Sequence, residues 1–507
     1  MTVVALDRPE RSPTGTAPAA TSAAAGTARG GVANLAATGF AGVSGLAVTW
    51  LVARSLGTAE AGAFFSATAS FVLGAALGKL GSQTSLVYWP ARLRARGEHG
   101  ALGRCLRLGL TPVALASVAV AAGLWVAAGF ASSPVYAGQL GILAFAVPAA
   151  ALGDALLAAT RGYRVLRPTV ALDRLLRPGL QLVLLGGLFL AGAGSPALFA
   201  AAWAAPYLPV ALLAGYALAR AHRTELARAP AHTATLGAGP YWRFTGPRAV
   251  ASIAQLALQR VDVLLVAALA GLAPAALYAV AGRFVVLGQL VNQSLSQAVQ
   301  PRLAERLATR DIPGANALYR RSTARLVVLT WPLYLCVAGY PTVYLGLFGN
   351  SYRAGAAIVG VLAVTMLAAT ACGMVDMVLA MGGRTWANLA SAGTALVVLL
   401  AVDAVLIPRL GAVGAAYGLA AAVLTNNLLP LLQVWRGLRV HPFGRATLVG
   451  AGLAAACFGV PALVLQVVAP ADAARPLVAA ATITAGTAAY LAGLLRSRRL
   501  FAPSGEC

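Results

Sequence analysis

The residues of this chain that could do chemistry are a few ionisable side chains inside long apolar segments. They are Lys79, Asp154, Arg260, Asp262, Arg283, Asp376 and Asp403. An ionisable side chain at membrane depth costs roughly 2.5–3.5 kcal/mol on insertion scales, so it normally faces a cavity or a partner. The cations are candidates for binding an anionic ligand. The carboxylates Asp154, Asp262 and Asp376 are candidates for binding a coupling ion.

Several of these residues also have a purely structural interpretation. Lys79 and Asp154 lie towards the predicted cytoplasmic ends of their segments, where a side chain can snorkel to the headgroups. Asp403 lies near the opposite end of its segment, where headgroup water would hydrate it. Arg260 and Asp262 are two residues apart, about 200° around a helix, so one cavity cannot hold both. One of these two is expected to pair with a neighbouring helix.

Arg283 is the leading candidate for a binding residue. It lies about ten residues into its apolar segment, which is near mid-bilayer at the helical rise of about 1.5 Å per residue. Asp376 is either its ion-pair partner or a separate titrating group.

One face of the eighth apolar segment carries a row of glutamines: Gln289, Gln293, Gln297 and Gln300. At about 100° per residue they fall within an arc of roughly 80°, with Arg283 beside it. In lipid the amides would be unsatisfied, so the row is expected to face water, a polar substrate or, through interhelical hydrogen bonds, another helix. Thr68, Lys79 and Gln83 share a face of the second segment in the same way. Two polar helix faces predict one wet cleft.

The elements that would position these residues are membrane-spanning helices. Of the 507 residues, 59% are hydrophobic and only 10% are charged, with a mean hydropathy of +0.78, whereas soluble domains have about 25% charged residues. A spanning helix needs about 20 mainly apolar residues. Division of the chain at arginine clusters and Gly/Pro turns predicts about fourteen segments: 31–53, 61–89, 105–130, 137–160, 175–193, 196–219, 246–271, 274–299, 323–348, 355–381, 385–407, 411–435, 446–468 and 475–496.

Arginine is concentrated in alternate gaps between these segments. Clusters follow the second, fourth, sixth and eighth segments, whereas residues 132–139 and 192–197 hold no arginine. Excess positive charge marks cytoplasmic loops, so the pattern predicts a multi-pass protein of the bacterial plasma membrane with both termini in the cytoplasm. The net charge of +24 then reflects attraction to anionic membrane lipids. Because the basic residues form no continuous stripe, no nucleic-acid partner is expected.

The predicted organisation is two pseudo-symmetric six-helix bundles around a central cleft, followed by two more helices. Its parts are a disordered cytoplasmic tail (1–30), a first lobe (31–219), a cytoplasmic linker (220–245), a second lobe (246–436), two last helices (437–496) and a cytoplasmic tail (497–507). A shift of 214 residues aligns the first hairpin of each lobe, so that Gly57 meets Gly271 and Phe64 meets Tyr278. Duplicated bundles with a binding site at their interface are a recurring transporter plan.

Enzyme chemistry finds no support in this sequence. The five cysteines are isolated from one another, and the four histidines lie in predicted loops far from carboxylate clusters, so no metal site is expected. Residues 74–80 resemble a phosphate-binding loop, but they have the wrong glycine spacing and no Ser or Thr after the lysine. A transporter without a cofactor is expected.

Four short stretches resemble the oligosaccharide flippases, the Wzx-type family of the multidrug/oligosaccharidyl-lipid/polysaccharide export superfamily. They are LVARSLGTAEAGAF at 51–64, Asp262 followed by YAVAGRF at 278–284, QPRL at 300–303 and LGAVGAA at 410–416. The similarity covers about residues 31–496 and extends to the plan of two bundles and two trailing helices. Lipid II flippases of this superfamily have cavity arginines in the first helix, where this chain has Asn34 and Thr38. This difference disfavours lipid II as the cargo.

The resemblance implies export of a polyprenyl-diphosphate-linked oligosaccharide from the inner to the outer leaflet, for cell-surface polysaccharide biosynthesis, by alternating access. The residues it assigns are Lys79, Arg260 and Arg283 for the diphosphate, and Gln289, Gln293 and Gln297 for the glycan. It also implies a polysaccharide polymerase and glycosyltransferases as protein partners. Two alternatives stay open. One is a multidrug or metabolite cation antiporter of the same fold, and the other is a non-transporting scaffold that recruits glycan-assembly enzymes.

Overall fold

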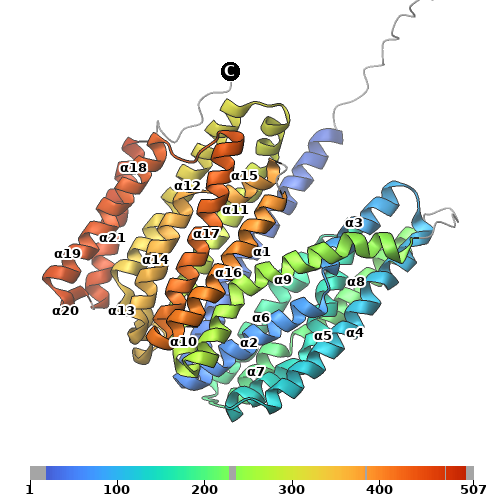
Figure 1. The fold of residues 1–507 in the computed structure, drawn as a ribbon, viewed down its shortest axis with the longest axis horizontal. Helices are drawn as coiled ribbons and strands as arrows, with labels where there is room; N and C mark the ends of the chain where they lie inside the picture. Colours follow the sequence, from blue (N-terminus) through green and yellow to red (C-terminus); the bar gives the residue numbers. More distant parts are fainter. Residues whose placement is uncertain (1–18, 228–235, 383–384, 474, 498–507) are drawn as a thin grey trace, which may run out of the picture.

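The computed structural model describes residues 19–227, 236–382, 385–473 and 475–497, which are almost entirely helical (Figure 1). Thirteen stretches in these ranges are long and apolar enough to cross a membrane: Ala36–Ser55, Thr58–Ala95, His99–Gly129, Pro134–Gly162, Pro196–Leu226, Ala238–Leu269, Leu272–Ala308, Ile312–Gly339, Asn350–Met381, Trp386–Leu410, Ala412–Leu438, Arg445–Val468 and Pro476–Arg496. The fourteenth predicted segment, 175–193, is also helical, over η2 (Thr169–Leu176) and α6 (Arg177–Leu190). The expected all-α polytopic fold is confirmed.

The first bundle contains α1 to α8. Its elements are α1 (Ala19–Ser55), α2 (Thr58–Gly78), α3 (Ser82–Ala95), η1 (His99–Ala101), α4 (Leu102–Gly129), α5 (Pro134–Gly162), η2, α6, α7 (Pro196–Ala204) and α8 (Tyr207–Leu226). Helix α5 is central and packs against α2, α3, α4 and α8, while α1 packs against η2 and α6. Helix α1 already includes residues 19–30, which were expected to belong to a disordered tail. Residues 1–18 and 498–507 of the two predicted tails lie outside the described residues.

The second bundle contains α9 to α17, and a trailing group follows it. The elements are α9 (Ala238–Leu269), α10 (Leu272–Ala281), α11 (Arg283–Ala308), α12 (Ile312–Gly339), α13 (Pro341–Gly346), η3 (Asn350–Gly355), α14 (Ala356–Ala371), α15 (Val375–Met381), α16 (Thr385–Leu410), α17 (Ala412–Leu438), α18 (Arg445–Ala454), η4 (Ala455–Gly459), α19 (Val460–Val468), α20 (Pro470–Ala473) and α21 (Pro476–Arg496). Helices α16 and α17 form a long pair, and α14 packs against α12 and α17. The trailing helices pack on the outer side of α12.

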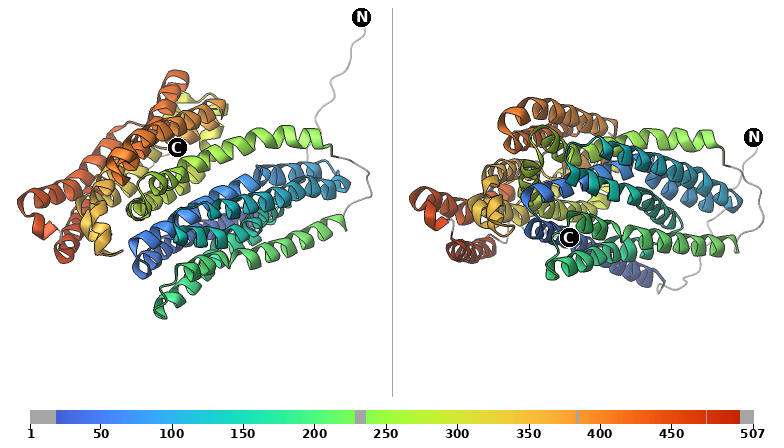
Figure 2. Two further views of the ribbon diagram at one scale, coloured as in Figure 1. Left: turned by 60° about the horizontal axis from the view of Figure 1, so that its bottom comes forward. Right: turned by 90° about the horizontal axis from the view of Figure 1, so that it is seen from below.

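The two bundles meet at the α1–α2 and α9–α10 hairpins, where α2 packs against α9 and α10. Gly57 and Gly271, which the internal repeat aligns, each cap the start of a helix in these hairpins. At Gly62 a Cβ atom would lie 1.8 Å from the carbonyl oxygen of Leu272, so the close approach requires glycine. From this contact the bundles diverge towards the other end of the molecule (Figures 1 and 2). The ends of α3, α8 and α11 and the start of α12, with their arginines, lie at this diverging end, called below the arginine-rich end.

Helix α9 packs against both bundles. Near its start, Ala249 lies against Gly81 in the α2–α3 connection, where a Cβ would come within 2.7 Å of the Ala249 Cα atom. Gly81 has φ +70°, so both its space and its backbone conformation favour glycine. In the later part of α9, Leu258 packs against Ala395 and Leu399 of α16. The segment that carries Arg260 and Asp262 therefore lies where α9 passes from the first bundle to the second.

Five segments that were predicted as continuous are interrupted, and a candidate residue lies beside three of these interruptions. Lys79 is the C-cap of α2, the first residue of the break (79–81) that separates α2 from α3. Arg283 directly follows Gly282, which separates α10 from α11. Asp376 lies in the first turn of α15, just after the break that follows α14. Transporters often bind their substrates and ions at discontinuous membrane helices, because the break frees polar backbone groups.

Candidate functional site

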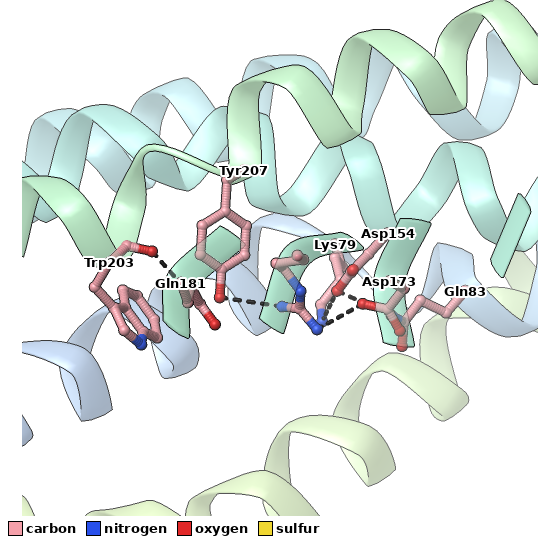
Figure 3. Close-up of polar contacts among 8 residues, drawn as sticks. Lys79, Gln83, Asp154, Asp173, Gln181, Trp203 and Tyr207 are labelled. Carbon is pink, nitrogen blue, oxygen red and sulfur yellow. Dashed lines mark hydrogen bonds and ion pairs between the residues drawn. The ribbon is translucent and has the colours of Figure 1, made fainter. Parts of the chain in front are cut away.

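In the first bundle, the structure brings Lys79 and Asp154 together (Figure 3). The Nζ atom of Lys79 lies 2.9 Å from the Oδ2 atom of Asp154, and the Gln83 amide donates a weaker hydrogen bond to the same oxygen at 3.4 Å. The Lys79 and Asp154 side chains are 17% and 30% exposed. Burial of this kind disfavours an unpaired charge, so the ion pair stabilises the α2–α5 contact.

A second ion pair lies close to the first (Figure 3). It joins Asp173 of η2 to Arg177, the first residue of α6. The Arg177 guanidinium lies 2.5 Å from the Asp173 carboxylate and donates to the Tyr207 hydroxyl at 3.1 Å. Arg174 donates to the hydroxyl of Thr38 on α1. Gln181, one turn after Arg177, donates to the Trp203 carbonyl at 2.9 Å. These contacts link α1, η2, α6, α7 and α8.

This second pair was not predicted from the sequence as part of a site. Arg174 and Arg177 were counted with the arginine cluster that follows the fourth segment and marks a cytoplasmic gap. The spacing of Asp173 and Arg177 is the signal that could have revealed them, since opposite charges four residues apart pair on one helix face. The helix in fact starts at Thr169, six residues before the predicted start at 175, so Asp173 and Arg177 belong to one helix.

In the second bundle, Arg260 and Arg283 are cations that contact no carboxylate among the described residues. In the described ranges neither forms an ion pair within 4 Å, and the Nε atoms of both are buried without a hydrogen-bond partner. The two guanidinium charges are near enough to repel each other. The Arg283 guanidinium lies 5.9 Å from the ring centre of Phe65 on α2. Two uncompensated arginines therefore lie where the bundles meet, and an anionic ligand would satisfy both.

Asp262 lies near enough to Arg260 for their charges to attract each other, but the hydrogen bonds of its carboxylate go to other groups. It is 4% exposed, and its carboxylate accepts from the Tyr278 hydroxyl at 2.5 Å and from the Val263 amide at 2.8 Å. Tyr278 lies on α10, so the expectation that Asp262 or Arg260 pairs with a neighbouring helix is confirmed for Asp262. The aligned position in the first bundle is Phe64, which has no hydroxyl.

Asp403 on α16 is fully buried, and neither carboxylate oxygen has a hydrogen-bond partner in the described part of the chain. The expectation that headgroup water hydrates Asp403 is wrong, because the carboxylate packs against α17 instead. A Cβ at Gly418 would lie 1.8 Å from its Oδ1 atom. The charges of Asp403 and Asp262 are near enough to repel each other. An ionised carboxylate without a partner is very costly in such a place, so Asp403 requires a proton or a cation.

Asp376 does not pair with Arg283. Its Oδ1 atom is buried without a partner, and among the described residues no carboxylate lies within 4 Å of the Arg283 guanidinium. Of the two interpretations for Asp376, a separate titrating group is the one that agrees with this geometry. Groups of three or more potential metal ligands are not found in the described ranges.

The glutamine row on α11 is exposed along its length: Gln289, Gln293, Gln297 and Gln300. None of these side chains donates or accepts a hydrogen bond within the described part of the chain, which disagrees with the interhelical alternative. Gln297 follows Leu290 by seven residues, so the two lie within about 20° on the helix. Leu290 packs against Gly42 of α1. The row thus borders the contact between α11 and α1, beside the line where the bundles meet.

Comparisons with known proteins support the fold. No family model matches the sequence, and none of the curated proteins matches it. Among solved structures, the lipid II flippase MurJ in an inward closed conformation has a TM-score of 0.72 at 13% identity, covering 93% of this chain and 100% of that chain. An inward-facing multidrug resistance transporter of the MATE family, in the MOP superfamily, has a TM-score of 0.62 at 12% identity, covering 81% and 98%. A mutant of the Vibrio cholerae MATE transporter VcmN has a TM-score of 0.53 at 15% identity, covering 81% and 97%.

Proposed function

We propose that this protein is a flippase that moves a polyprenyl-diphosphate-linked oligosaccharide from the inner to the outer leaflet by alternating access. The observation that carries the proposal is the pair of uncompensated arginines, Arg260 and Arg283, where the two bundles meet. The fold shared with a lipid II flippase and with MATE transporters supports transport as the general activity. In this proposal the protein is a transporter and performs no covalent chemistry.

A diphosphate fits the two arginines because guanidinium groups bind phosphate oxygens with two parallel hydrogen bonds. Sugar hydroxyls cannot enter hydrocarbon without losing their hydration, and the exposed amides of Gln289, Gln293 and Gln297 offer hydrogen bonds in its place. The polyprenyl tail stays in the bilayer throughout. Lys79 was expected to bind the diphosphate as well, but its ion pair with Asp154 makes it a weaker partner for a new anion than the two free arginines.

The membrane potential favours this direction of transport. Outward movement of a negative charge gains about 2.3 kcal/mol per charge per 100 mV, so two diphosphate charges supply roughly 4–5 kcal/mol. Coupling of transport to a proton or sodium gradient would therefore add to the driving force that the membrane potential supplies. We assign it to the buried carboxylates Asp262 and Asp403, with Asp154 and Asp376 as the other candidates from the sequence.

A multidrug or metabolite cation antiporter is the second candidate, because MATE transporters share the fold. A cation carrier needs acidic groups that reach the cargo. Asp262 is capped by Tyr278, Asp403 is fully buried and Asp154 is neutralised by Lys79. Arg260 and Arg283, which contact no described carboxylate and are only partly buried, are instead positive, which favours an anionic cargo.

The proposed setting is the bacterial plasma membrane, with the arginine-rich end and both termini in the cytoplasm. A polysaccharide polymerase and glycosyltransferases remain the proposed partners. This orientation places the diverging end of the bundles on the side where a lipid-linked glycan would be loaded.

The test is flipping by purified protein in liposomes, with a fluorescent glycan on a polyprenyl diphosphate and, for comparison, on a polyprenyl monophosphate. The double variant Arg260→Gln, Arg283→Gln should lower the diphosphate rate at least about tenfold, the effect of about 1.4 kcal/mol. Arg220→Gln is the matched control, because Arg220 is an exposed arginine at the end of α8. Flipping at the wild-type rate by the double variant would show that Arg260 and Arg283 do not form the diphosphate site. Proton-driven export of ethidium by the wild type, without glycan flipping, would favour the antiporter.

A further inference from the structure

An apolar pocket lies on the second bundle, and none of the proposed cargo-binding residues lines it. It has a volume of about 520 Å³ and is lined by Leu428, Leu431, Leu432, Trp435, His441 and Phe443. The first four residues belong to the last three turns of α17, and the last two to the connection that leads to α18. Leu428, Trp435 and Phe443 remain 52%, 58% and 48% exposed. The pocket is therefore open at the surface of the protein.

One side of this pocket carries an uncompensated positive charge. The Arg320 guanidinium on α12 contacts the ring of His441, whose backbone amide is anchored by the Asn316 side chain at 2.9 Å. Burial and the neighbouring Arg320 charge lower the pKa of His441, so its ring is neutral and accepts from Arg320. The Nε atom of Arg320 is buried without a partner. Among the described residues no carboxylate lies within 4 Å of Arg320.

The depth of these groups matches one half of a bilayer. Helix α17 ends at the arginine-rich end with Arg436 in its last turn. Leu428 lies eight residues before Arg436, about 12 Å deeper at about 1.5 Å per residue. The apolar lining therefore lies at the depth of acyl chains, with Trp435 near the interface that tryptophan prefers. Arg320 and His441 lie at the level of the headgroups.

We propose that this pocket binds a membrane phospholipid with an anionic headgroup, with one acyl chain along Leu428, Leu431 and Trp435 and the phosphate on Arg320 and His441. An anionic phosphate supplies the counter-charge that Arg320 lacks. The bound lipid joins α12, α17 and the start of α18 at the arginine-rich end. This binding needs only a membrane, so it does not depend on the cargo proposed above.

The experiment compares two lipids with identical chains, dioleoyl phosphatidylglycerol and dioleoyl phosphatidylcholine. Purified full-length protein in detergent is titrated with each, and the bound lipid is counted by native mass spectrometry. We expect the first phosphatidylglycerol to bind about tenfold more tightly than the first phosphatidylcholine, the ratio that about 1.4 kcal/mol produces. Glycerol 3-phosphate, which has the headgroup charge but no chain, should not displace the lipid at equal concentration.

Two variants separate the headgroup from the chain. Arg320→Gln should reduce the preference for phosphatidylglycerol to less than about twofold, whereas Leu431→Trp, which fills the pocket, should weaken both lipids equally. Their matched controls are Arg220→Gln and Leu212→Trp on α8, at exposed positions that line no part of this pocket. If Arg320→Gln does not yield folded protein, His441→Phe tests the headgroup contact in its place.

Three results would overturn the proposal. The first is equal affinity of the wild type for the two lipids. The second is an equal loss of phosphatidylglycerol in Arg320→Gln and Arg220→Gln, which would indicate general surface charge. The third is competition by glycerol 3-phosphate as strong as that by the lipid, which would indicate a site for free anions. Flipping of the glycan need not be measured, so failure here leaves the proposed function untouched.

Discussion

Lys79 at the end of α2 and Asp154 on α5 form a 2.9 Å ion pair although 75 residues separate them in the chain. The pair lies beside the break between α2 and α3, and the Arg177–Asp173 pair lies near it (Figure 3). In the first bundle, Lys79 and Arg177 are thus each neutralised by a carboxylate. Arg260 and Arg283 of the second bundle contact no carboxylate in the described ranges. This asymmetry supports the proposal that the second bundle binds the anion and that the network of the first bundle is structural.

The first prediction concerns that ion pair. Lys79→Gln or Asp154→Asn alone should lower the free energy of unfolding by roughly 1–3 kcal/mol, less than the about 3–5 kcal/mol of a fully buried pair. The double variant should recover most of this loss, because it leaves no unpaired charge. Thermal unfolding in detergent measures all three variants. Losses that simply add would show that the two residues are not coupled.

The same double variant also distinguishes two roles of Lys79. If Lys79 acts only through its ion pair, the double variant should flip the lipid-linked glycan at close to the wild-type rate. A stable double variant that no longer flips would instead return Lys79 to the diphosphate site.

The second prediction concerns the contact between the bundles. Gly62→Ala would place a Cβ against the backbone carbonyl of Leu272, which cannot rotate away as a flexible side chain can. The variant should lose about 1–3 kcal/mol of stability through overpacking and should flip slowly, because the hairpins are forced apart. Gly123→Ala in α4 is the control: its Cβ would meet nothing within 4 Å, so a gain of about 0.5–1 kcal/mol is expected. Equal stability of the two variants would contradict the close packing of α2 on α10.

The candidate residues themselves could be found from the sequence, but their partners could not. An ionisable residue in an apolar segment is visible in the chain, and Lys79, Asp154, Arg260 and Arg283 were all identified in that way. Which of them are neutralised depends on packing between helices that are distant in sequence. The α2–α5 contact decides this for Lys79. For Arg283 it is decided by the start of α11, where the guanidinium lies near Phe65 of α2 and no described carboxylate is in contact.

The sequence also did not reveal where the helices break or that Asp403, near one end of its segment, is buried. Gly282 and Gly373 look like many other glycines in a chain that contains 55, so the breaks beside Arg283 and Asp376 were not predicted. Asp403 was expected near water because it lies towards one end of its segment. Its burial arises from Gly418, a residue of the next helix whose missing side chain leaves room for the carboxylate.

The third prediction concerns ion coupling. Asp403→Asn removes a charge that has no partner in the described residues, so the variant should fold with unchanged or higher stability. If a proton or sodium ion binds at Asp403 and Asp262, flipping by Asp403→Asn should no longer respond to a pH or sodium gradient, while the response to membrane potential persists. Glu305→Gln makes the same charge change at an exposed site on α11 and should keep the gradient response. A normal response in Asp403→Asn would exclude this carboxylate from coupling.

The fourth prediction concerns the glutamine row. Gln293 and Gln297 are exposed and make no side-chain hydrogen bonds within the described part of the chain, so Gln293→Leu with Gln297→Leu should change stability by less than about 0.5 kcal/mol. If the row binds sugar hydroxyls, the variant should flip the glycan-bearing lipid several times more slowly. It should flip the bare polyprenyl diphosphate at the wild-type rate, because the arginines that hold the diphosphate are intact. An equal loss of flipping rate for both lipids would indicate that the glutamines matter for the structure of the protein and not for sugar binding. No loss for either lipid would indicate that the row faces acyl chains. Only a loss confined to the glycan-bearing lipid agrees with a glutamine face that the cargo passes.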